Sequence, residues 1–213
     1  MSRVAVLKFP GTNGDYDVLR ALDLVGLRGE LVWYRDFRSG VYDAVVLAGG
    51  FSYGDYLRAG AIAAQTPALE HVRRDAERGA PVLGICNGFQ ILVEAGLLPG
   101  ALAPNEPPGF VSKWIKVQVV DVKTPFTHLY EPGEVVHMPI AHAEGRYIPS
   151  GPYTQAFRYV ENPNGSYDNT GGVSRGNVLG LMPHPERAVD GDISRGGVGG
   201  LKLWLSLKEW LKR

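Results

Sequence analysis

The only cysteine of the chain, Cys86, lies in the segment best suited to chemistry. Its neighbours form the sequence Gly84-Ile85-Cys86-Asn87-Gly88, after an apolar run and before a helical pattern. A nucleophile flanked by glycines in this setting is typical of a nucleophile elbow, a sharp strand-to-helix turn. A thiol at a helix N-terminus also gains thiolate character from the helix dipole. The spacing predicts a nucleophile; the competing interpretation is a buried cysteine that acts as a small apolar side chain.

A nucleophilic cysteine needs a base, and His184 is the best placed of the five histidines. It follows a strand-like segment at 179–182 and lies between two prolines, which we expect to hold its backbone extended. In extended backbone, residues i and i+2 point to the same side, so Glu186 can orient the imidazole and stabilise the imidazolium. The alternative is a turn in which Glu186 and Arg187 form a surface ion pair.

Acyl transfer also needs hydrogen-bond donors for the developing oxyanion, usually backbone N–H groups. A Gly49-Gly50 loop follows the apolar segment 44–48 and can supply the N–H of Gly50. The N–H of Asn87 can supply the second donor. A plain β-turn accounts equally well for the two glycines taken alone.

Other chemistry finds little support in the sequence. His137 and His142 suggest a metal pair, but Pro139 excludes a shared helical face and no cysteine or third histidine lies near them. The chain also lacks the G-x-x-x-x-G-K-[ST] phosphate-binding loop. We therefore expect no metal, and no nucleotide site of that type, on this chain.

The elements that position these residues alternate between strand and helix in the first 100 residues. Strands are predicted at 3–9, 31–34, 44–48 and 81–85. Helices are predicted around the apolar face of Val18, Leu22 and Val25, ending near Gly26, at 68–78, and from about 87 to 95. We expect Asn13 or Asp15 to cap the first helix. Further strands are predicted at 114–122, 135–138, 154–160 and 178–182, as hairpins or parts of a mixed sheet, before an amphipathic helix at 201–211. The pattern predicts one α/β domain over 1–213, with an open, mostly parallel or mixed sheet flanked by helices.

The composition is that of a globular protein. Of 213 residues, 45% are hydrophobic and 21% charged, which argues against disorder. Lys and Arg total 22, as do Asp and Glu, so the net charge is zero. Nucleic acid or an anionic membrane surface is therefore not the expected partner. With one cysteine, no signal-peptide pattern and no long apolar run, we expect a cytoplasmic protein.

Taken together, the motifs resemble those of class I (triad-type) glutamine amidotransferases, through residues 84–90 (GICNGFQ) and 182–186 (MPHPE). Four other segments resemble one subfamily, the glutaminase subunits of phosphoribosylformylglycinamidine synthase: 9–13 (FPGTN), 49–55 (GGFSYGD), 139–146 (PIAHAEGR) and 162–166 (NPNGS). The matching segments extend from residue 9 to residue 187. Ala143 stands where the subfamily has glycine and residues 12–14 also differ, but neither departure touches the triad.

The resemblance implies a flavodoxin-like fold and roles for six residues: the nucleophile Cys86, the base His184, its orienting partner Glu186, the oxyanion-hole residues Gly50 and Asn87, and the glutamine-binding residue Gln90. The reaction follows from these roles. The thiolate attacks the side-chain amide of glutamine, and the base protonates the departing ammonia. Water then hydrolyses the γ-glutamyl thioester.

Ammonia released into water would be protonated and lost, so a second active site must receive it. The resemblance implies that this site lies on the synthetase subunit PurL, with the small subunit PurS in the complex. ATP and magnesium are then expected on the synthetase, and no cofactor on this chain. Segments 53–58 and 142–147 are candidates for the docking surface, or else are ordinary loops around a pocket.

Two other interpretations compete. The same half-reaction can serve another synthase, such as that of pyridoxal phosphate or imidazole glycerol phosphate, but segments 9–14 and 139–146 argue against this. A non-catalytic protein of related architecture can keep an elbow cysteine as a redox sensor. Such a sensor has no use for His184 and Glu186.

Overall fold

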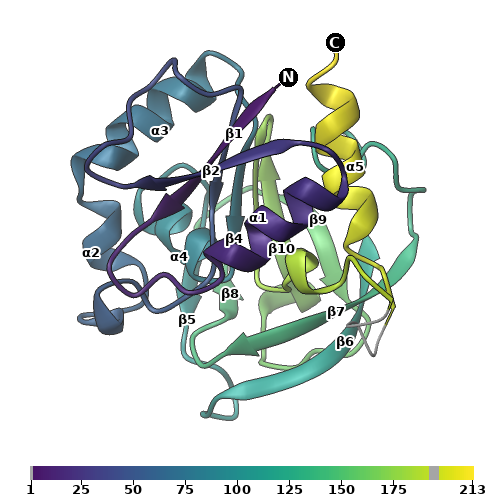
Figure 1. The fold of residues 1–213 in the computed structure, drawn as a ribbon. Coiled ribbons are helices and arrows are strands. Elements are labelled where there is room, and N and C mark those ends of the chain that lie inside the picture. Colours follow the sequence, from purple (N-terminus) through teal and green to yellow (C-terminus); the bar gives the residue numbers. More distant parts are fainter. Residues whose placement is uncertain (1, 192–196) are drawn as a thin grey trace.

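The computed structural model describes residues 2–191 and 197–213, and a sheet with helices on both faces forms its centre (Figure 1). The strands are β1 (Arg3–Lys8), β2 (Arg28–Trp33), β3 (Ala44–Leu47), β4 (Val82–Ile85), β5 (Ala101–Ala103), β6 (Val111–Val119), β7 (Val135–His142), β8 (Arg146–Ile148), β9 (Thr154–Tyr159), β10 (Thr170–Arg175) and β11 (Val178–Leu181). The helices are α1 (Asp15–Leu24), α2 (Ala61–Ala64), α3 (Pro67–Glu77), α4 (Asn87–Glu94) and α5 (Leu201–Trp210). Three short 3-10 turns are η1 (Ser52–Asp55), η2 (Tyr167–Asn169) and η3 (Pro185–Arg187).

Nine strands form one mixed sheet in the order β2-β1-β3-β4-β11-β10-β9-β6-β7, and β5 pairs with β8 separately. Neighbouring strands are parallel from β2 to β11 and antiparallel from β11 to β7. Every residue of β3, β4 and β11 is buried, as expected for parallel strands whose two faces are both covered. The predicted α/β fold with a mixed sheet is confirmed.

The helices cover both faces of the parallel part of the sheet. In Figure 1, α1 and α5 lie in front of the strands, and α4 lies behind them. Helix α4 follows directly after β4 and is buried from Asn87 to Val93. Its first turn therefore lies against the carboxyl ends of β3 and β4, the edge where open α/β sheets bind ligands.

Two features differ from the prediction. The first helix has no side-chain cap: Gly14 occupies the N-cap position, and Asp15 forms an ion pair with Lys8 at 2.6 Å. Strands β5, β8 and β10 were not anticipated. The first two are only three residues long, and β10 contains Gly171 and Gly172, which weaken the strand pattern. In the described part of the chain, no helix is long and apolar enough to cross a membrane.

Candidate active site

Cys86 occupies the turn between β4 and α4 with a positive φ, at φ 50° and ψ −105°. Its backbone N–H donates to the carbonyl of Leu181, and its own carbonyl accepts from the N–H of Gln90. A non-glycine residue in such a conformation costs about 1–3 kcal/mol and persists only where its surroundings fix it. The turn has the geometry of the predicted nucleophile elbow.

The glycines on either side of Cys86 are needed for close approach of the backbone. A Cβ atom at Gly88 would overlap the carbonyl oxygen of Leu47, at the end of β3. A Cβ atom at Gly84 would lie 2.6 Å from the carbonyl oxygen of Gly88. Any side chain at these positions would push α4 away from the sheet and move the thiol with it.

His184 and Glu186 form a buried pair. Nδ1 of His184 and Oε1 of Glu186 are 2.6 Å apart, and both side chains are almost fully buried. The predicted contact is confirmed, but the reason given for it is wrong, because residues 185–187 form the turn η3 rather than extended backbone. Pro185 opens this turn, where its missing N–H is no loss. Arg187 contacts Asp17 at 3.2 Å and lies 3.9 Å from Glu186, so the surface ion-pair alternative does not describe the buried carboxylate.

The side chains of Cys86 and His184 both lie against Gly49. A Cβ atom built on Gly49 would lie 2.9 Å from Cε1 of His184 and 3.6 Å from Cβ of Cys86. Nε2 of His184 has no hydrogen-bond partner among the described residues, so it is free to exchange a proton with the thiol. Burial disfavours the imidazolium, but the charges of Glu186 and Cys86 outweigh burial and raise the pKa of His184 to about 9. The three residues have the arrangement of a thiol triad.

The close approach at Gly49 gives a first prediction. Replacing Gly49 with alanine should displace the imidazole and lower glutaminase activity by about 10- to 100-fold, because small misplacements of a reacting group are costly. Thermal unfolding should change little, since the imidazole is a side chain that can shift. Gly191→Ala is the matched control, because a Cβ there meets no atom of the described residues within 4 Å. Full activity in Gly49→Ala would contradict the placement of His184.

The predicted oxyanion donors follow β3 and the elbow cysteine along the chain. Asn87 is the first residue of α4, where backbone N–H groups have no helical acceptor. The N–H groups of Asn87 and Gly50 donate to no other group in the described part of the chain. Gly50 has no room for a side chain, since a Cβ atom would lie 2.7 Å from the carbonyl oxygen of Gly11. Their role as an oxyanion hole stays a prediction.

The side chains of Asn87 and Gln90 belong to a buried network. Nδ2 of Asn87 donates to Oε1 of Gln90 at 2.9 Å, and Oδ1 of Asn87 accepts from the N–H of Ser52 at 3.1 Å. Nε2 of Gln90 donates to the carbonyl of Glu144 at 2.7 Å. Gln90 thus ties α4 to the segment 142–147. Whether it also holds glutamine, as the resemblance implies, stays a prediction.

Two carboxylates beside this network were not anticipated. Asp55 lies 3.5 Å from Nδ2 of Asn87, and Glu144 accepts from the N–H of Ala59 at 3.0 Å. Burial, followed by the charge of Glu144, raises the pKa of Asp55 to about 6. Asp55 forms no ion pair within the described residues, so this anionic wall suits a cationic group of a substrate. The only signal in the sequence was that both residues fall in segments of the resemblance.

The same contacts locate the two docking candidates. Segments 53–58 and 142–147 lie together beside the elbow. The side chain of Glu144 accepts a hydrogen bond from the backbone N–H of Ala59, the residue after Arg58. Tyr56 and Leu57 are 74% and 88% exposed, so the apolar part of the first segment faces outward. Both segments therefore lie beside the predicted site residues of α4.

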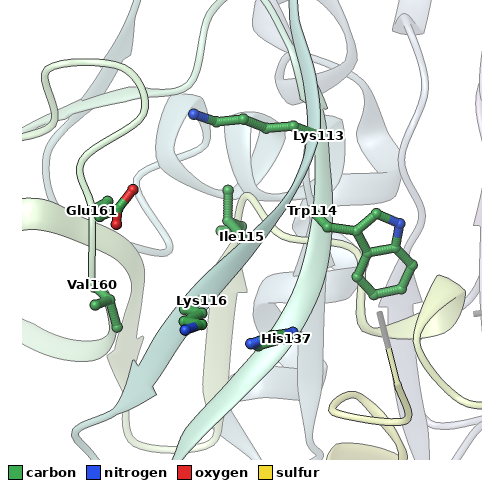
Figure 2. Close-up of a pocket in the computed structure, with 7 residues that line it drawn as sticks. All are labelled: Lys113, Trp114, Ile115, Lys116, His137, Val160 and Glu161. Carbon is green, nitrogen blue, oxygen red and sulfur yellow. The ribbon is translucent and has the colours of Figure 1, made fainter. Parts of the chain in front are cut away.

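A separate cavity of about 240 Å³ lies on the hairpin of β6 and β7, away from the triad (Figure 2). It is lined by Lys113, Trp114, Ile115, Lys116, His137, Val160 and Glu161. None of the predicted site residues belongs to it. His137 lines this cavity, whereas His142 is buried beside Oδ1 of Asn105, so the two histidines do not share a site. Among the described residues, no cluster of three or more His, Cys, Asp or Glu side chains could hold a metal ion.

Known proteins resemble the chain in sequence and in structure. A family model for the CobB/CobQ-like glutamine amidotransferase domain matches residues 1–195. Phosphoribosylformylglycinamidine synthase subunit PurQ from Pyrobaculum aerophilum is 76% identical, over 99% of this chain and 100% of that protein. The subunit of the same name from Pyrococcus horikoshii is 53% identical, over 100% of both chains. In the solved structure of PurLQS from Thermotoga maritima, one chain is 44% identical with a TM-score of 0.95, over 99% of this chain and 100% of that one.

Proposed function

The chain belongs to the CobB/CobQ-like glutamine amidotransferases and, within them, to the PurQ subunits of phosphoribosylformylglycinamidine synthase, and we propose that Cys86, His184 and Glu186 are the residues with which it hydrolyses glutamine. It is the glutaminase subunit of that synthase in purine biosynthesis, and its partners are PurL and PurS. Ammonia passes to the synthetase subunit, which converts formylglycinamide ribonucleotide to formylglycinamidine ribonucleotide with ATP. The alternative synthases are thereby set aside.

The acylation step uses the pair over Gly49. The proton of the Cys86 thiol lies on Nε2 of His184, whose raised pKa favours the imidazolium, and the thiolate attacks the side-chain carbonyl carbon of glutamine. The N–H groups of Gly50 and Asn87 stabilise the resulting oxyanion. The imidazolium then gives its proton to the amide nitrogen as the carbon–nitrogen bond breaks. Ammonia leaves, and a γ-glutamyl thioester remains on the cysteine.

The deacylation step uses the same groups in reverse order. With ammonia gone, neutral His184 takes a proton from water, and the hydroxide attacks the thioester carbonyl. The oxyanion forms again at the same donors, and glutamate leaves as the sulfur is released. Glu186 holds Nδ1 of His184 throughout, which keeps Nε2 directed at the reacting atoms. The meeting of Cys86 with the buried His184–Glu186 pair is the observation that carries the proposal.

Ammonia chemistry of this kind requires no cofactor on this chain. We place ATP and magnesium on the synthetase subunit, since the sequence has no phosphate-binding loop of the G-x-x-x-x-G-K-[ST] type. A cytoplasmic location is part of the same proposal.

The proposal predicts that the partners stimulate glutaminase activity, because an uncoupled subunit would waste glutamine. Glutamate release should be slow for the chain alone. It should rise at least tenfold with PurL, PurS, formylglycinamide ribonucleotide and ATP, and Cys86→Ala serves as the blank. Equal turnover with and without the partners would contradict coupling. No release in any mixture, from folded protein, would contradict the triad and favour the redox sensor.

The carboxylates Asp55 and Glu144 are proposed to face the α-ammonium group of glutamine. Asp55→Asn should raise the KM for glutamine about tenfold, since a charge-assisted contact is lost, and change kcat less. The same variant should be more stable at pH 7, because burial and Glu144 disfavour the charged form of Asp55. We expect its free energy of unfolding to rise by about 1 kcal/mol, since solvent screens this half-buried carboxylate.

The sign of this stability gain follows from the raised pKa of Asp55, about 6 against the ordinary value of 3.8. The carboxylate destabilises the fold above pH 6, and its effect disappears as the pH falls from about 6 toward 3.8. The gain in Asp55→Asn should therefore shrink over this range. Asp23→Asn, an exposed carboxylate on α1, is the control. An unchanged KM would contradict the contact with glutamine.

A further inference from the structure

The loop between β7 and β8, residues 143–145, carries groups of the proposed site. The carbonyl of Glu144 accepts from Nε2 of Gln90 at 2.7 Å, and its carboxylate accepts from the N–H of Ala59 at 3.0 Å. A loop is more mobile than the strands it joins, so a loop that carries site groups must be held in place by other contacts.

Asn105 supplies these contacts. It lies just after β5, is 2% exposed, and its backbone N–H donates to the carbonyl of Ala143 at 2.8 Å. Its Oδ1 accepts from the N–H of Gly145 at 3.0 Å, and its Nδ2 donates to the carbonyl of His142 at 2.9 Å. Asn105 therefore binds the backbone on both sides of Glu144 and fixes the position of that residue.

The side chain of Asn105 also fixes the tautomer of His142. Nδ2 donates to two carbonyls, those of His142 and Gly109, each at 2.9 Å, so the other amide atom is the acceptor Oδ1. Oδ1 lies 3.0 Å from Nδ1 of His142, which must then carry a proton. Burial, followed by the charge of His184, lowers the pKa of His142 to about 4, so the ring is neutral at pH 7. Neutral hydrogen bonds thus hold the loop at the pH where the enzyme works.

The backbone around Asn105 is itself held. Strand β5 pairs antiparallel with β8, so the chain segments before Asn105 and after the loop lie side by side (Figure 1). The N–H of Glu106 donates to the carbonyl of Asn164 at 3.0 Å, and the N–H of Tyr147 donates to Oγ of Ser166 at 3.0 Å. The segment 162–166, to which the mechanism assigns no role, therefore supports both sides of this contact.

We propose that Asn105 is a positioning residue for glutamine binding, which holds Glu144 toward the α-ammonium group of the substrate. The inference rests on the proposed function, in which Asp55 and Glu144 face that group. Asn105 acts through Glu144, and through its carbonyl on Gln90, rather than on the reacting atoms. Its loss should therefore weaken binding and discrimination more than the chemical steps.

The test compares glutamine with 4-carbamoylbutanoate, which is glutamine without its α-amino group, as nitrogen sources for the complex with PurL and PurS. The readout is formylglycinamidine ribonucleotide formation. The wild type should prefer glutamine by about 100-fold in kcat/KM, because carboxylates placed for a cation reject an analogue that lacks it. In Asn105→Ala the KM for glutamine should rise about tenfold, kcat should change less, and the preference should fall about tenfold. A ratio of two kcat/KM values does not depend on the folded fraction, so a loss of stability alone leaves it unchanged.

Asn177→Ala is the matched control. Nδ2 of Asn177 also donates to two carbonyls, those of Ala76 at 2.9 Å and Ala80 at 2.6 Å. Asn177 precedes β11, which is parallel to β4, so it lies at the amino ends of these strands, whereas Cys86 follows the carboxyl end of β4. The control should lose stability, as Asn105→Ala does, and keep the wild-type KM and preference.

A second variant decides the matter if Asn105→Ala does not fold. An added Cβ at Gly145 would lie 2.4 Å from Nδ1 of His142 and would push the ring away from Asn105. Gly145→Ala should therefore also lower the preference for glutamine. A wild-type preference in this variant would overturn the role of the Asn105 contacts.

The outcomes separate the inference from the proposed function. A wild-type complex that forms no product from glutamine would contradict the proposed function itself. A wild type that uses both compounds equally well would contradict the contact with the α-ammonium group, and the inference with it. If the wild type prefers glutamine and Asn105→Ala keeps both the KM and the preference, only the role of Asn105 is overturned. An equal loss of preference in Asn177→Ala would also overturn it, because the effect would then be a general one.

Discussion

Replacing Cys86 with alanine should abolish glutamine-dependent synthesis by the complex and leave its ammonia-dependent synthesis intact. We expect glutamate release to fall by about 10⁴-fold or more, because removing a nucleophile leaves only binding and the oxyanion donors. The synthetase site is on another subunit, so ammonium chloride should restore product formation. The measurement is formylglycinamidine ribonucleotide formation with either nitrogen source.

A suitable control exists for this variant. Cys86 is buried, and its sulfur donates a weak hydrogen bond to the carbonyl of Ala141 at 3.7 Å, so alanine should preserve the fold and the assembly of the complex. Ser52→Ala is the matched variant, since Ser52 is buried near the elbow and its hydroxyl has no partner in the described structure. Substantial glutamine-dependent turnover in Cys86→Ala would contradict the triad.

Replacing Glu186 with glutamine should lower glutaminase activity by about 10²- to 10⁴-fold, because the orienting member of the triad loses its charge. The amide keeps the size of the carboxylate but can no longer fix the tautomer of His184 by charge. The buried imidazolium also loses its largest source of stabilisation. This variant should therefore be impaired in kcat more than in KM.

The raised pKa of His184 also predicts the direction in which the pH profile of activity should shift in Glu186→Gln. His184 must be protonated to release ammonia, and its pKa of about 9 keeps it so through neutral pH. Wild-type activity should fall as the pH rises through about 9. In Glu186→Gln, burial dominates, the pKa of His184 falls, and the alkaline limb should move to lower pH. An alkaline limb at the same pH as in the wild type would show that Glu186 does not raise the pKa of His184.

The elbow was predictable from sequence because everything that forms it is local. Gly84, Cys86 and Gly88 lie within five residues, and the steric need for both glycines follows from one sharp turn. The His184–Glu186 contact was also local, and it was predicted correctly although the backbone is a turn. Prolines restrict the backbone, but they do not distinguish an extended segment from a 3-10 turn.

The residues that the sequence did not reveal depend on contacts between distant segments. Strand β10 lies between β9 and β11 in the sheet, and strand order in the antiparallel half has no local signal. Asp55 and Glu144 are 89 positions apart and meet through a loop in which Tyr53, Asp55 and Leu57 all have positive φ. Such a conformation is fixed by packing, so composition and periodicity do not predict it.

Trapping the γ-glutamyl thioester tests the central claim most directly. The assembled complex would be mixed with glutamine, quenched in acid within milliseconds to seconds, and digested for mass analysis of the peptide that carries Cys86. We predict a γ-glutamyl adduct on this cysteine that forms before glutamate appears, accumulates more in a variant slowed in deacylation, and is absent from Cys86→Ala. Glutamate release without any adduct at Cys86, or an adduct on another residue, would contradict the account.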